Sequence, residues 1–385
     1  MELLGKSKEE LREMCAAMGE PAYRGGQIYH ALYAERKFAL AQMTNLPVAF
    51  RERLAAETSI TLPAVKQRFA SSDGSVRYLF DLGGAEKQES AIGAAQAARE
   101  KNAAKSLLPE TEQKSLRLAS VEAVFMPSEG RQTICVSTQA GCAVDCHFCL
   151  TAQLGLIRNL TAGEILAQVL LPIDEHKERL APQTNIVLMG QGEPLLNFDA
   201  VMAAVRIVLD PEGIGISPKH VTLSTSGIIP GIERLGAEPV RPKLAISLNA
   251  SNDEQRNSLM PINKKYPLEF LLAACRKYPL RTWEHLTFEY VMLGGMNDAA
   301  EDARRVVRML APLKSVKVNL IPWNPGELPY RESTAERIEE FRRILVDRGI
   351  PAFVRHSRGR DVMAACGQLA LLQIENASVS APVAG

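Results

Sequence analysis

The spacing of apolar residues changes along the chain, and each change predicts a different kind of element. Residues 1–62 carry apolar residues at helical spacing, and Ser7 with Glu10 forms a capping box at the start of the first predicted helix. Two runs with a period of two then flank the turn residues at 72–74, which is typical of a β-hairpin. A further strand is predicted at 121–126, so helices are followed by a hairpin and a strand.

From residue 133 to about residue 354, apolar strands alternate with helical segments. Strands are predicted at 133–138, 185–190, 220–225, 243–248, 286–292 and 316–321. Helices fit between them, for example from the capping box of Thr161 and Glu164 and over 299–312. A last helix near 334–348 precedes a short apolar run at 351–354. Six βα units in succession predict an α/β fold, a partial (β/α)6 TIM-like parallel barrel; a closed eight-stranded barrel would need more repeats.

The same pattern divides the chain into four parts. Domains usually contain about 100–200 residues, so only the longest part has the size of a large domain. A small helical accessory domain is predicted at 1–62, and a hairpin and strand extension at 63–132. The extension contains a segment at about 84–117 that is rich in Ala, Lys, Glu, Gln and Ser, which predicts a mobile insertion. The barrel is predicted at 133–355, and 356–385 form a C-terminal loop whose tail is expected to be frayed.

Composition indicates the kind of cellular compartment in which the protein works. The hydrophobic fraction of 46% supports a large core, no run of 18 apolar residues predicts a transmembrane helix, and the N-terminus lacks the form of a signal peptide. We therefore expect a reducing, cytoplasmic compartment in which cysteines serve metal or redox chemistry. The net charge of +1 gives no general attraction to nucleic acid, so an RNA site must be a local basic patch.

Three of the seven cysteines, Cys142, Cys146 and Cys149, lie within eight residues in the spacing C-x3-C-x2-C. A loop this tight can point three thiolates at one centre, and three thiolates suit a four-iron cluster with one iron free of protein ligands. A structural zinc site would need a fourth ligand, and His147 is too near its neighbours to serve well. Chance clustering of buried cysteines is the third interpretation, and the pattern favours the cluster.

Several predicted strands end in small or polar residues, and barrel enzymes carry their reactive groups at such ends. The strand at 185–190 runs into Gly192 and Glu193, where glycine permits close approach of a ligand to the backbone and the carboxylate can hold an ammonium group. Similar polar ends follow at 223–227, 246–250 and 321–325. Each end alone is consistent with ordinary turn chemistry, but their recurrence favours a polar ring around a cofactor.

The cysteine loop, with Phe148 before its last cysteine and an apolar strand ahead of it, resembles the signature of the radical S-adenosylmethionine superfamily. This resemblance implies a 4Fe-4S cluster whose open iron is chelated by the amino and carboxylate groups of S-adenosylmethionine. A reduced cluster of this kind cleaves the cofactor to a 5′-deoxyadenosyl radical.

Five longer segments narrow the resemblance to one family. They are STQAGC at 137–142, MGQGEPL at 189–195, PINKKY at 261–266, NLIPWNP at 319–325 and AACGQL at 364–369. Together they resemble the RlmN family of dual-specificity RNA methyltransferases. The resemblance implies methylation at C2 of an adenine of 23S rRNA, in the peptidyl-transferase centre, and of an adenine of the tRNA anticodon loop. We further expect an electron donor such as flavodoxin or ferredoxin, a monomer and no membrane partner.

The resemblance also implies roles for single residues. The matches to cluster ligands are Cys142, Cys146 and Cys149. The matches to cofactor positions are Gly192, Glu193, Ser224, Ser247, Leu248, Asn249 and Asn324. Cys366 matches the cysteine that accepts a methyl group, Cys135 its disulfide-forming partner and Glu122 the proton acceptor. The chain departs from the family by having Asn249 where histidine is common, and by the insertion at 84–117, which lengthens the approach to Glu122.

The chemistry of the target carbon agrees with these roles. C2 of adenine is electron-poor and carries no acidic hydrogen, so a plain nucleophilic methyl transfer should fail there. The Cys366 thiolate can take a methyl group from one S-adenosylmethionine, and the radical from a second molecule can activate it, so two molecules are used per turnover. Glu122 or Cys135 can take the ring proton. Cys135 then attacks the sulfur of Cys366, which releases the product and leaves a disulfide.

Two other functions compete with this interpretation. The first is a Cfr-type enzyme, which methylates C8 of the same rRNA adenine. Spacing does not distinguish the two enzymes, and only the closer resemblance of the whole motifs favours the RlmN family. A non-catalytic iron–sulfur RNA-binding protein would not need the pair of Cys135 and Cys366. Cys15 and Cys275 lie in helical patterns and are expected to be core residues.

Two stretches of the chain are locally basic. The first includes Lys6, Lys8, Arg12, Arg24, Arg36 and Lys37, which form either a solvated helical face or phosphate contacts of the accessory domain. The second, with Arg355, His356, Arg358 and Arg360, precedes Cys366. It is either a solvated loop or a phosphate-binding one, and its position ahead of a reactive cysteine in an RNA enzyme favours phosphate binding.

Overall fold

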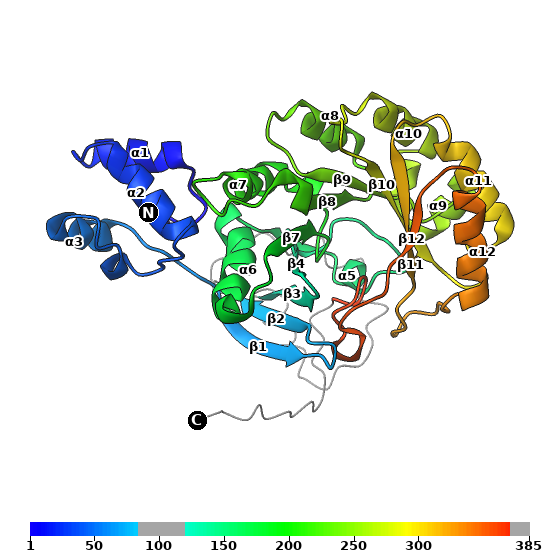
Figure 1. The fold of residues 1–385 in the computed structure, drawn as a ribbon, viewed down its shortest axis with the longest axis horizontal. Helices are drawn as coiled ribbons and strands as arrows, with labels where there is room; N and C mark the ends of the chain where they lie inside the picture. The colour runs from blue at the N-terminus through cyan, green and yellow to red at the C-terminus, as the bar shows by residue number, and fades with distance from the viewer. Residues whose placement is uncertain (84–119, 370–385) are drawn as a thin grey trace, which may run out of the picture.

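The computed structural model describes residues 1–83 and 120–369, and a ten-stranded sheet dominates it (Figure 1). In spatial order the strands are β1 (Ala64–Ala70), β2 (Val76–Asp81), β3 (Ser120–Ser128), β4 (Arg131–Val136), β7 (Gln183–Leu188), β8 (Val221–Thr225), β9 (Lys243–Ser247), β10 (Leu286–Met292), β11 (Val316–Pro322) and β12 (Ala352–Val354). The predicted insertion at 84–117 and the predicted frayed tail lie outside the described residues.

The seven strands from β4 to β12 run parallel, and helices connect them on the outside of the sheet (Figure 1). These helices are α6 (Ala162–Glu175), α7 (Phe198–Leu209), α8 (Ile229–Ala237), α9 (Asp253–Leu259), α10 (Leu268–Lys277), α11 (Ala300–Leu310) and α12 (Ala335–Val346). The predicted partial barrel is confirmed, and the apolar run at 351–354 adds a seventh parallel strand to the six predicted ones. In the described part of the chain β1 and β12 do not pair, so the barrel is open.

The predicted hairpin and the strand that follows it continue the barrel sheet. β1, β2, β3 and β4 pair in antiparallel fashion, and Val124 of β3 faces Cys135 of β4. Two short strands, β5 (Gln139–Gly141) and β6 (Leu156–Asn159), and helix α5 (Leu150–Gln153) frame the loop that carries the three clustered cysteines. The antiparallel extension therefore borders the part of the barrel where these cysteines lie.

Three N-terminal helices, α1 (Lys8–Ala17), α2 (Tyr23–Tyr33) and α3 (Val48–Glu57), lie to one side of the barrel (Figure 1). The capping box predicted at Ser7 and Glu10 forms at the start of α1. Tyr29 of α2 donates a hydrogen bond to Asp210, just after α7, at 2.8 Å, which joins these helices to the barrel. No described helix is long and apolar enough to cross a membrane.

Strand residues alternate between the hydrophobic core and the inside of the open barrel. Leu244 and Ile246 of β9 belong to the main hydrophobic core together with residues of the helices. In the intervening positions Ser247 of β9 pairs with Glu289 of β10, and Glu289 pairs with Asn319 of β11. Polar side chains thus stand where branched apolar residues fill a closed barrel, which suits the inside of this one to a polar ligand.

Candidate active site

Backbone hydrogen bonds fix the cysteine loop on three sides. The N–H of Cys142 donates to the carbonyl of Gly155, before β6, at 2.9 Å. The N–H of His147 donates to the carbonyl of Leu259, at the end of α9, also at 2.9 Å. The first residue of α5 donates to the carbonyl of Gly367 at 2.8 Å. The loop is therefore anchored to the small sheet, to the barrel and to the C-terminal segment.

The thiols of Cys142, Cys146 and Cys149 lie in a setting that disfavours bare thiolates. Burial raises the pKa of each thiol, to about 12 for Cys142, and the neighbouring thiols raise the pKa of Cys142 and Cys146 further. Thiolates held this close need a cationic partner, which fits an iron–sulfur cluster. Within residues 1–83 and 120–369, no three His, Cys, Asp or Glu side chains are arranged to hold one metal ion, so the joint binding of a cluster by these three cysteines stays a prediction.

The turn after β7 requires glycine and encloses a carboxylate. Gly192 has a φ of +100°, and a Cβ atom there would lie 2.6 Å from the Cβ of Gln139. Glu193, which is 3% exposed, accepts hydrogen bonds from the N–H and the hydroxyl of Ser226, both at 2.7 Å, and from the N–H of Leu195 at 3.1 Å. Burial raises the pKa of Glu193, and these hydrogen bonds oppose the rise. The carboxylate is thereby fixed in one orientation.

A buried arginine holds the ends of β8 and β9 together. The guanidinium of Arg256 donates to the carbonyl oxygens of Ser226 at 2.6 Å, and of Ser247 and Leu248 at 3.1 Å each. Asn263 accepts a fourth hydrogen bond at 2.9 Å. Burial lowers the pKa of Arg256 to about 10, so the guanidinium stays cationic at neutral pH. Two of the predicted cofactor positions are thus placed by one buried cation.

Asn249 follows these positions in the left-handed region, with a φ of +56°. Its Oδ1 atom accepts from the N–H of Val291 at 2.8 Å, and its Nδ2 atom donates to the sulfur of Met260 at 3.3 Å. Both polar atoms of the side chain are engaged within the protein, so a cofactor contact by Asn249 stays a prediction. Beside this turn the hydroxyls of Ser224 and Ser247 lie 3.5 Å apart.

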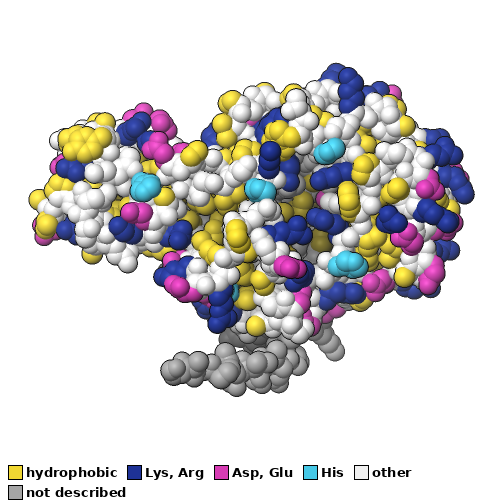
Figure 2. Space-filling model, in the orientation of Figure 1, with side chains coloured by type: hydrophobic (Ala, Val, Ile, Leu, Met, Phe, Trp, Pro, Cys, Tyr) yellow, Lys and Arg dark blue, Asp and Glu magenta, His cyan; other side chains and the backbone are white. Residues whose placement is uncertain are grey.

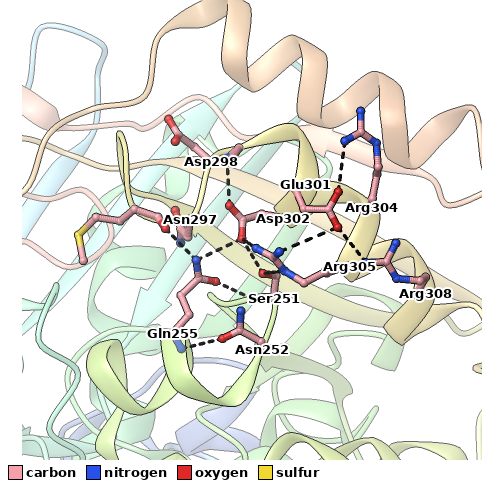
Figure 3. A network of polar contacts seen from close by, with 12 residues as sticks. Ser251, Asn252, Gln255, Asn297, Asp298, Glu301, Asp302, Arg304, Arg305 and Arg308 are labelled. Carbon is pink, nitrogen blue, oxygen red and sulfur yellow. Dashed lines mark hydrogen bonds and ion pairs between the residues drawn. The ribbon is translucent and has the colours of Figure 1, made fainter.

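A polar network between Ser251 and α11 supports the turn that contains Asn249, and Figure 3 shows the part of it from Ser251 onward. Asn297 donates from Nδ2 to the carbonyl of Asn249 at 2.8 Å. The hydroxyl of Ser251 donates to Asp302 of α11 at 2.6 Å, and Gln255 accepts from the N–H of Ser251 at 2.7 Å. Figure 3 shows these side chains gathered between the start of α9 and α11. The turn is therefore supported from outside the barrel.

Cys135 and Cys366, which are far apart in the sequence, come to one place. Cys135 packs against a cluster that contains Ala364 and Leu369, on either side of Cys366. Cys366 is exposed as a residue, but its thiol is desolvated by the surrounding protein. This desolvation raises the pKa of the thiol to about 12, and the thiols of Cys149 and Cys135 act in the same direction. All seven cysteines are free, so the expected disulfide between Cys135 and Cys366 is not seen.

Asn324, after β11, reaches the same segment. Its Nδ2 atom donates to the carbonyl of Cys366 at 3.1 Å. Its Oδ1 atom is buried and accepts no hydrogen bond within the described residues. An acceptor left without a donor at a predicted cofactor position fits a ligand that carries N–H groups.

Glu122 of β3 is fully buried in an ion pair with Arg77 of β2. Gln191 donates to the second carboxylate oxygen of Glu122 at 3.3 Å, and the hydroxyl of Ser137 donates to its backbone carbonyl at 2.6 Å. The predicted proton acceptor therefore lies beside the turn after β7, with its carboxylate held by a cation and an amide. Its catalytic role stays a prediction.

The basic loop after β12 is only partly available to RNA. Arg358 donates to the backbone of the β1–β2 turn at 3.3 Å, and Arg360 forms an ion pair with Glu332 at 3.3 Å. Arg355 and His356 are exposed. Figure 2 shows Lys and Arg side chains scattered over this face of the molecule, several of them around its middle. Binding of phosphates by this loop stays a prediction that rests mainly on Arg355.

Sequence reasoning overlooked three polar residues that build the site. Gln139 and Gln191 stand inside the segments that carry the family resemblance, so their positions could have drawn attention to them. Arg256 offered no signal, because its partners are carbonyl oxygens of two separate strands. Cys15 and Cys275 are buried, as expected of core residues.

Comparisons with known proteins agree with this site. A family model described as the Radical SAM superfamily matches residues 136–309, and one described as Ribosomal RNA large subunit methyltransferase N-terminal domain matches residues 1–60. The chain is 48% identical to a probable dual-specificity RNA methyltransferase RlmN of Koribacter versatilis, over 91% of this chain and 96% of that protein. It is 42% identical to a dual-specificity RNA methyltransferase RlmN of Anaeromyxobacter dehalogenans, over 94% and 90%.

A solved structure shares the fold and much of the sequence. A radical SAM methyltransferase from Sphaerobacter thermophilus superposes with a TM-score of 0.82 at 40% identity, covering 97% of this chain and 100% of that one. The family expected from the cysteine loop and the five longer segments is therefore confirmed. The chain belongs to the RlmN family of RNA methyltransferases, within the radical SAM superfamily.

Proposed function

We propose that this protein methylates C2 of adenine in 23S rRNA and in tRNA, with Cys366 as the carrier of the methyl group. The relatives are named as dual-specificity RNA methyltransferases, and the chain spans at least nine-tenths of each of them. One observation carries the proposal: Cys366 and Cys135 meet beside the cysteine loop, an arrangement that RNA binding alone would not need. The RlmN names of the relatives support C2 rather than the C8 of Cfr-type enzymes.

The cysteine loop supplies three of the four ligands that a 4Fe-4S cluster needs. In this proposal Cys142, Cys146 and Cys149 would hold the cluster, which would bind S-adenosylmethionine through an iron that has no protein ligand. A cluster held by these three cysteines and reduced by a donor of the flavodoxin or ferredoxin class would supply the electron for cleavage of S-adenosylmethionine to a deoxyadenosyl radical. We expect the protein to work as a monomer in the cytoplasm.

The strand ends orient the same molecule. The positions proposed to line its site are Gly192, Glu193, Ser224, Ser247, Leu248, Asn249 and Asn324. Glu193, which Ser226 holds in place, accepts from the methionyl ammonium group. Asn324 offers its unpaired Oδ1 atom to an N–H group of the ligand. These contacts fix the cofactor between the cysteine loop and the inside of the open barrel.

Two molecules of S-adenosylmethionine serve different purposes per turnover. The Cys366 thiolate attacks the methyl group of the first, so that a new S–CH3 bond forms, the sulfonium S–CH3 bond breaks and S-adenosylhomocysteine leaves. The deoxyadenosyl radical from the second molecule removes a hydrogen atom from this methyl group. The resulting carbon radical adds to C2 of the adenine, which must be unstacked to reach it.

Release of the product needs a base and a second thiol. Glu122 or Cys135 takes the proton from C2. The Cys135 thiolate attacks the sulfur of Cys366, so that an S–S bond forms while the S–CH2 bond breaks, and the one electron that the adduct gives up would return to the oxidised iron–sulfur cluster. The freed carbon takes up a proton and becomes the methyl group. The disulfide thus belongs to the end of a turnover and must be reduced before the next.

The decisive test is to identify the methylated carbon. Reconstituted protein, a reductant and methyl-labelled S-adenosylmethionine are incubated with an rRNA fragment and with a tRNA, and the digested nucleosides are compared with 2-methyl- and 8-methyladenosine standards by mass spectrometry. We expect 2-methyladenosine from both RNAs, and none from the Cys366→Ala variant. Formation of 8-methyladenosine would establish the Cfr-type reaction instead, and tight RNA binding without methylation would establish a binding protein.

A further inference from the structure

A carboxylate inside the open barrel has no task in the reaction described above. Glu289 lies on β10, level with Ser247 on β9 and with Asn319 on β11. The Nδ2 atom of Asn319 donates to the Oε1 atom of Glu289 at 2.8 Å. Glu289 and Asn319 are each 7% exposed. The pair therefore forms a fixed polar spot on the inner wall, in the same row as a proposed cofactor position.

The contacts of Glu289 with the protein do not fully offset the free-energy cost of burying its carboxylate. Asn319 is its only hydrogen-bond donor among the described residues, and Arg355 and Lys317 act on it as charges without forming an ion pair. Burial raises its pKa, and the hydrogen bond from Asn319 with the charges of Arg355 and Lys317 acts against that rise. A carboxylate buried with one hydrogen-bond donor and no ion pair keeps part of its desolvation cost, and a donor on a bound ligand would offset that cost.

Asn319, the partner of Glu289, lies on β11, and the same strand leads to Asn324, which donates to the carbonyl of Cys366 at 3.1 Å. Burial raises the pKa of the Cys366 thiol, and the thiols of Cys149 and Cys135 and the charge of Glu289 act in the same direction. A base that reaches the sulfur of Cys366 with its C2 atom brings the rest of its six-membered ring into this part of the barrel. The group next to Glu289 would then be on the same ring as the reacting carbon.

We propose that Glu289, held by Asn319, is a specificity-determining residue that accepts a hydrogen bond from the exocyclic amino group of the target adenine. This inference rests on the proposed function, because it takes an adenine as the substrate. An ionised carboxylate is only an acceptor, and adenine presents an amino donor at C6 where guanine presents an oxygen acceptor. The same oxygen that attracts adenine thus repels guanine. A site built to pair with a donor rejects bases that lack it.

RNA stem-loops that carry adenosine, or purine riboside without the amino group, at the target position test this contact. Their affinities are measured by fluorescence anisotropy with the reconstituted protein and with Glu289→Met and Glu289→Gln. For the unmodified protein, we expect the loss of the amino group to weaken binding about tenfold or more, since a hydrogen bond to a charged group is lost. The Glu289→Met variant should bind the adenosine RNA more weakly to a similar degree, and it should bind both RNAs with equal affinity. The Glu289→Gln variant keeps a carbonyl acceptor, so it should recover part of the preference for adenosine over purine riboside.

Binding is measured without turnover, so its result separates this inference from the proposed function. The inference is overturned if Glu289→Met keeps the full preference for adenosine. It is also overturned if the variant loses affinity for S-adenosylmethionine while its RNA preference is unchanged, because Glu289 would then serve the cofactor. Methylation of Cys366 in the absence of RNA, read as a mass gain of one methyl group, tests the proposed function on its own. The Glu289→Gln variant replaces Glu289→Met if the latter does not fold.

Discussion

A single hydrogen bond joins the side chain of Asn324 to the backbone of Cys366, from Nδ2 to the carbonyl oxygen at 3.1 Å. The residue proposed to bind the cofactor and the residue proposed to carry the methyl group are thereby parts of one unit. A ligand that engages the free Oδ1 atom of Asn324 also steadies the segment that presents the thiol.

Replacing Asn324 by Ala should weaken the binding of S-adenosylmethionine and loosen Cys366 together. Loss of one buried hydrogen bond to the ligand corresponds to about 1 kcal/mol, or about fivefold in the dissociation constant. Equilibrium dialysis of the reconstituted protein measures this change, and alkylation of Cys366 by a maleimide should become faster. Asn45→Ala, at an exposed position on the N-terminal helical part, is the control. Unchanged affinity in Asn324→Ala would remove Asn324 from the cofactor site.

Replacing Cys146 by Ala should abolish cluster binding, because the loop would keep only two of its three thiolates. Protein reconstituted without oxygen should hold about four irons per chain, and the variant should lose most of them along with the visible absorption of the cluster. Cys275→Ala removes a buried cysteine of α10 and should retain the iron. Zinc in place of iron after reconstitution of the unmodified protein would contradict this prediction.

Replacing Arg256 by Met should destabilise the fold and the cofactor site at once. The side chain donates to three carbonyl oxygens at the ends of β8 and β9, and these acceptors would be left buried without donors. We expect a loss of about 3 kcal/mol in the free energy of unfolding, measured by urea denaturation of the apoprotein. Arg304→Met, at an exposed ion pair on α11, should change it little. Equal stability of the two variants would show that the strand ends hold without Arg256.

Replacing Cys135 by Ala should trap the protein on its RNA. The methylene radical formed on Cys366 can still add to adenine, but no thiol remains to break the S–CH2 bond. Digestion followed by mass spectrometry should then find a nucleotide attached to the peptide that contains Cys366. Cys15→Ala is the matched control and should release its product normally. Normal turnover of Cys135→Ala would show that Cys135 is only a residue of the strand.

Replacing Arg355 by Ala should flatten the salt dependence of RNA binding. Arg355 is exposed, and its charge acts on Glu289 without forming an ion pair within the described residues, so its guanidinium can neutralise a phosphate. Removal of one phosphate contact should lower the slope of log affinity against log salt by about 1. Arg360, which is already paired with Glu332, should contribute less when it is replaced in the same way. Equal slopes for the unmodified protein and the Arg355→Ala variant would exclude this loop from the RNA site.

Periodicity found the strands because each is a run of buried residues between turns. It did not add the run at 351–354 to the barrel, since three paired residues are too few to show a period. Nor could it join the hairpin to the barrel, because the pairing of Val124 with Cys135 depends on register between distant segments.

The sequence predicted some residues of the candidate site better than others. The cysteine loop is local, so spacing alone indicated a cluster, whereas the meeting of Cys135 and Cys366 came only from resemblance. Arg256 and Glu289 act across strands, and their sequence neighbours say little about their partners. One feature of the sequence could have drawn attention to Glu289. It is a charged residue in an otherwise uncharged strand, and the structure shows that this strand is buried along its whole length.

The C-terminal segment lies directly on the cysteine loop: the carbonyl of Leu369 accepts a hydrogen bond from the hydroxyl of Thr151, and a Cβ atom at Gly367 would be 3.9 Å from the Cα of Cys149. Ribosomes make the loop and all seven parallel strands before they make this segment, and chains fold from the N-terminus during synthesis. The growing chain therefore passes through a stage in which the three thiols are present and this cover is not.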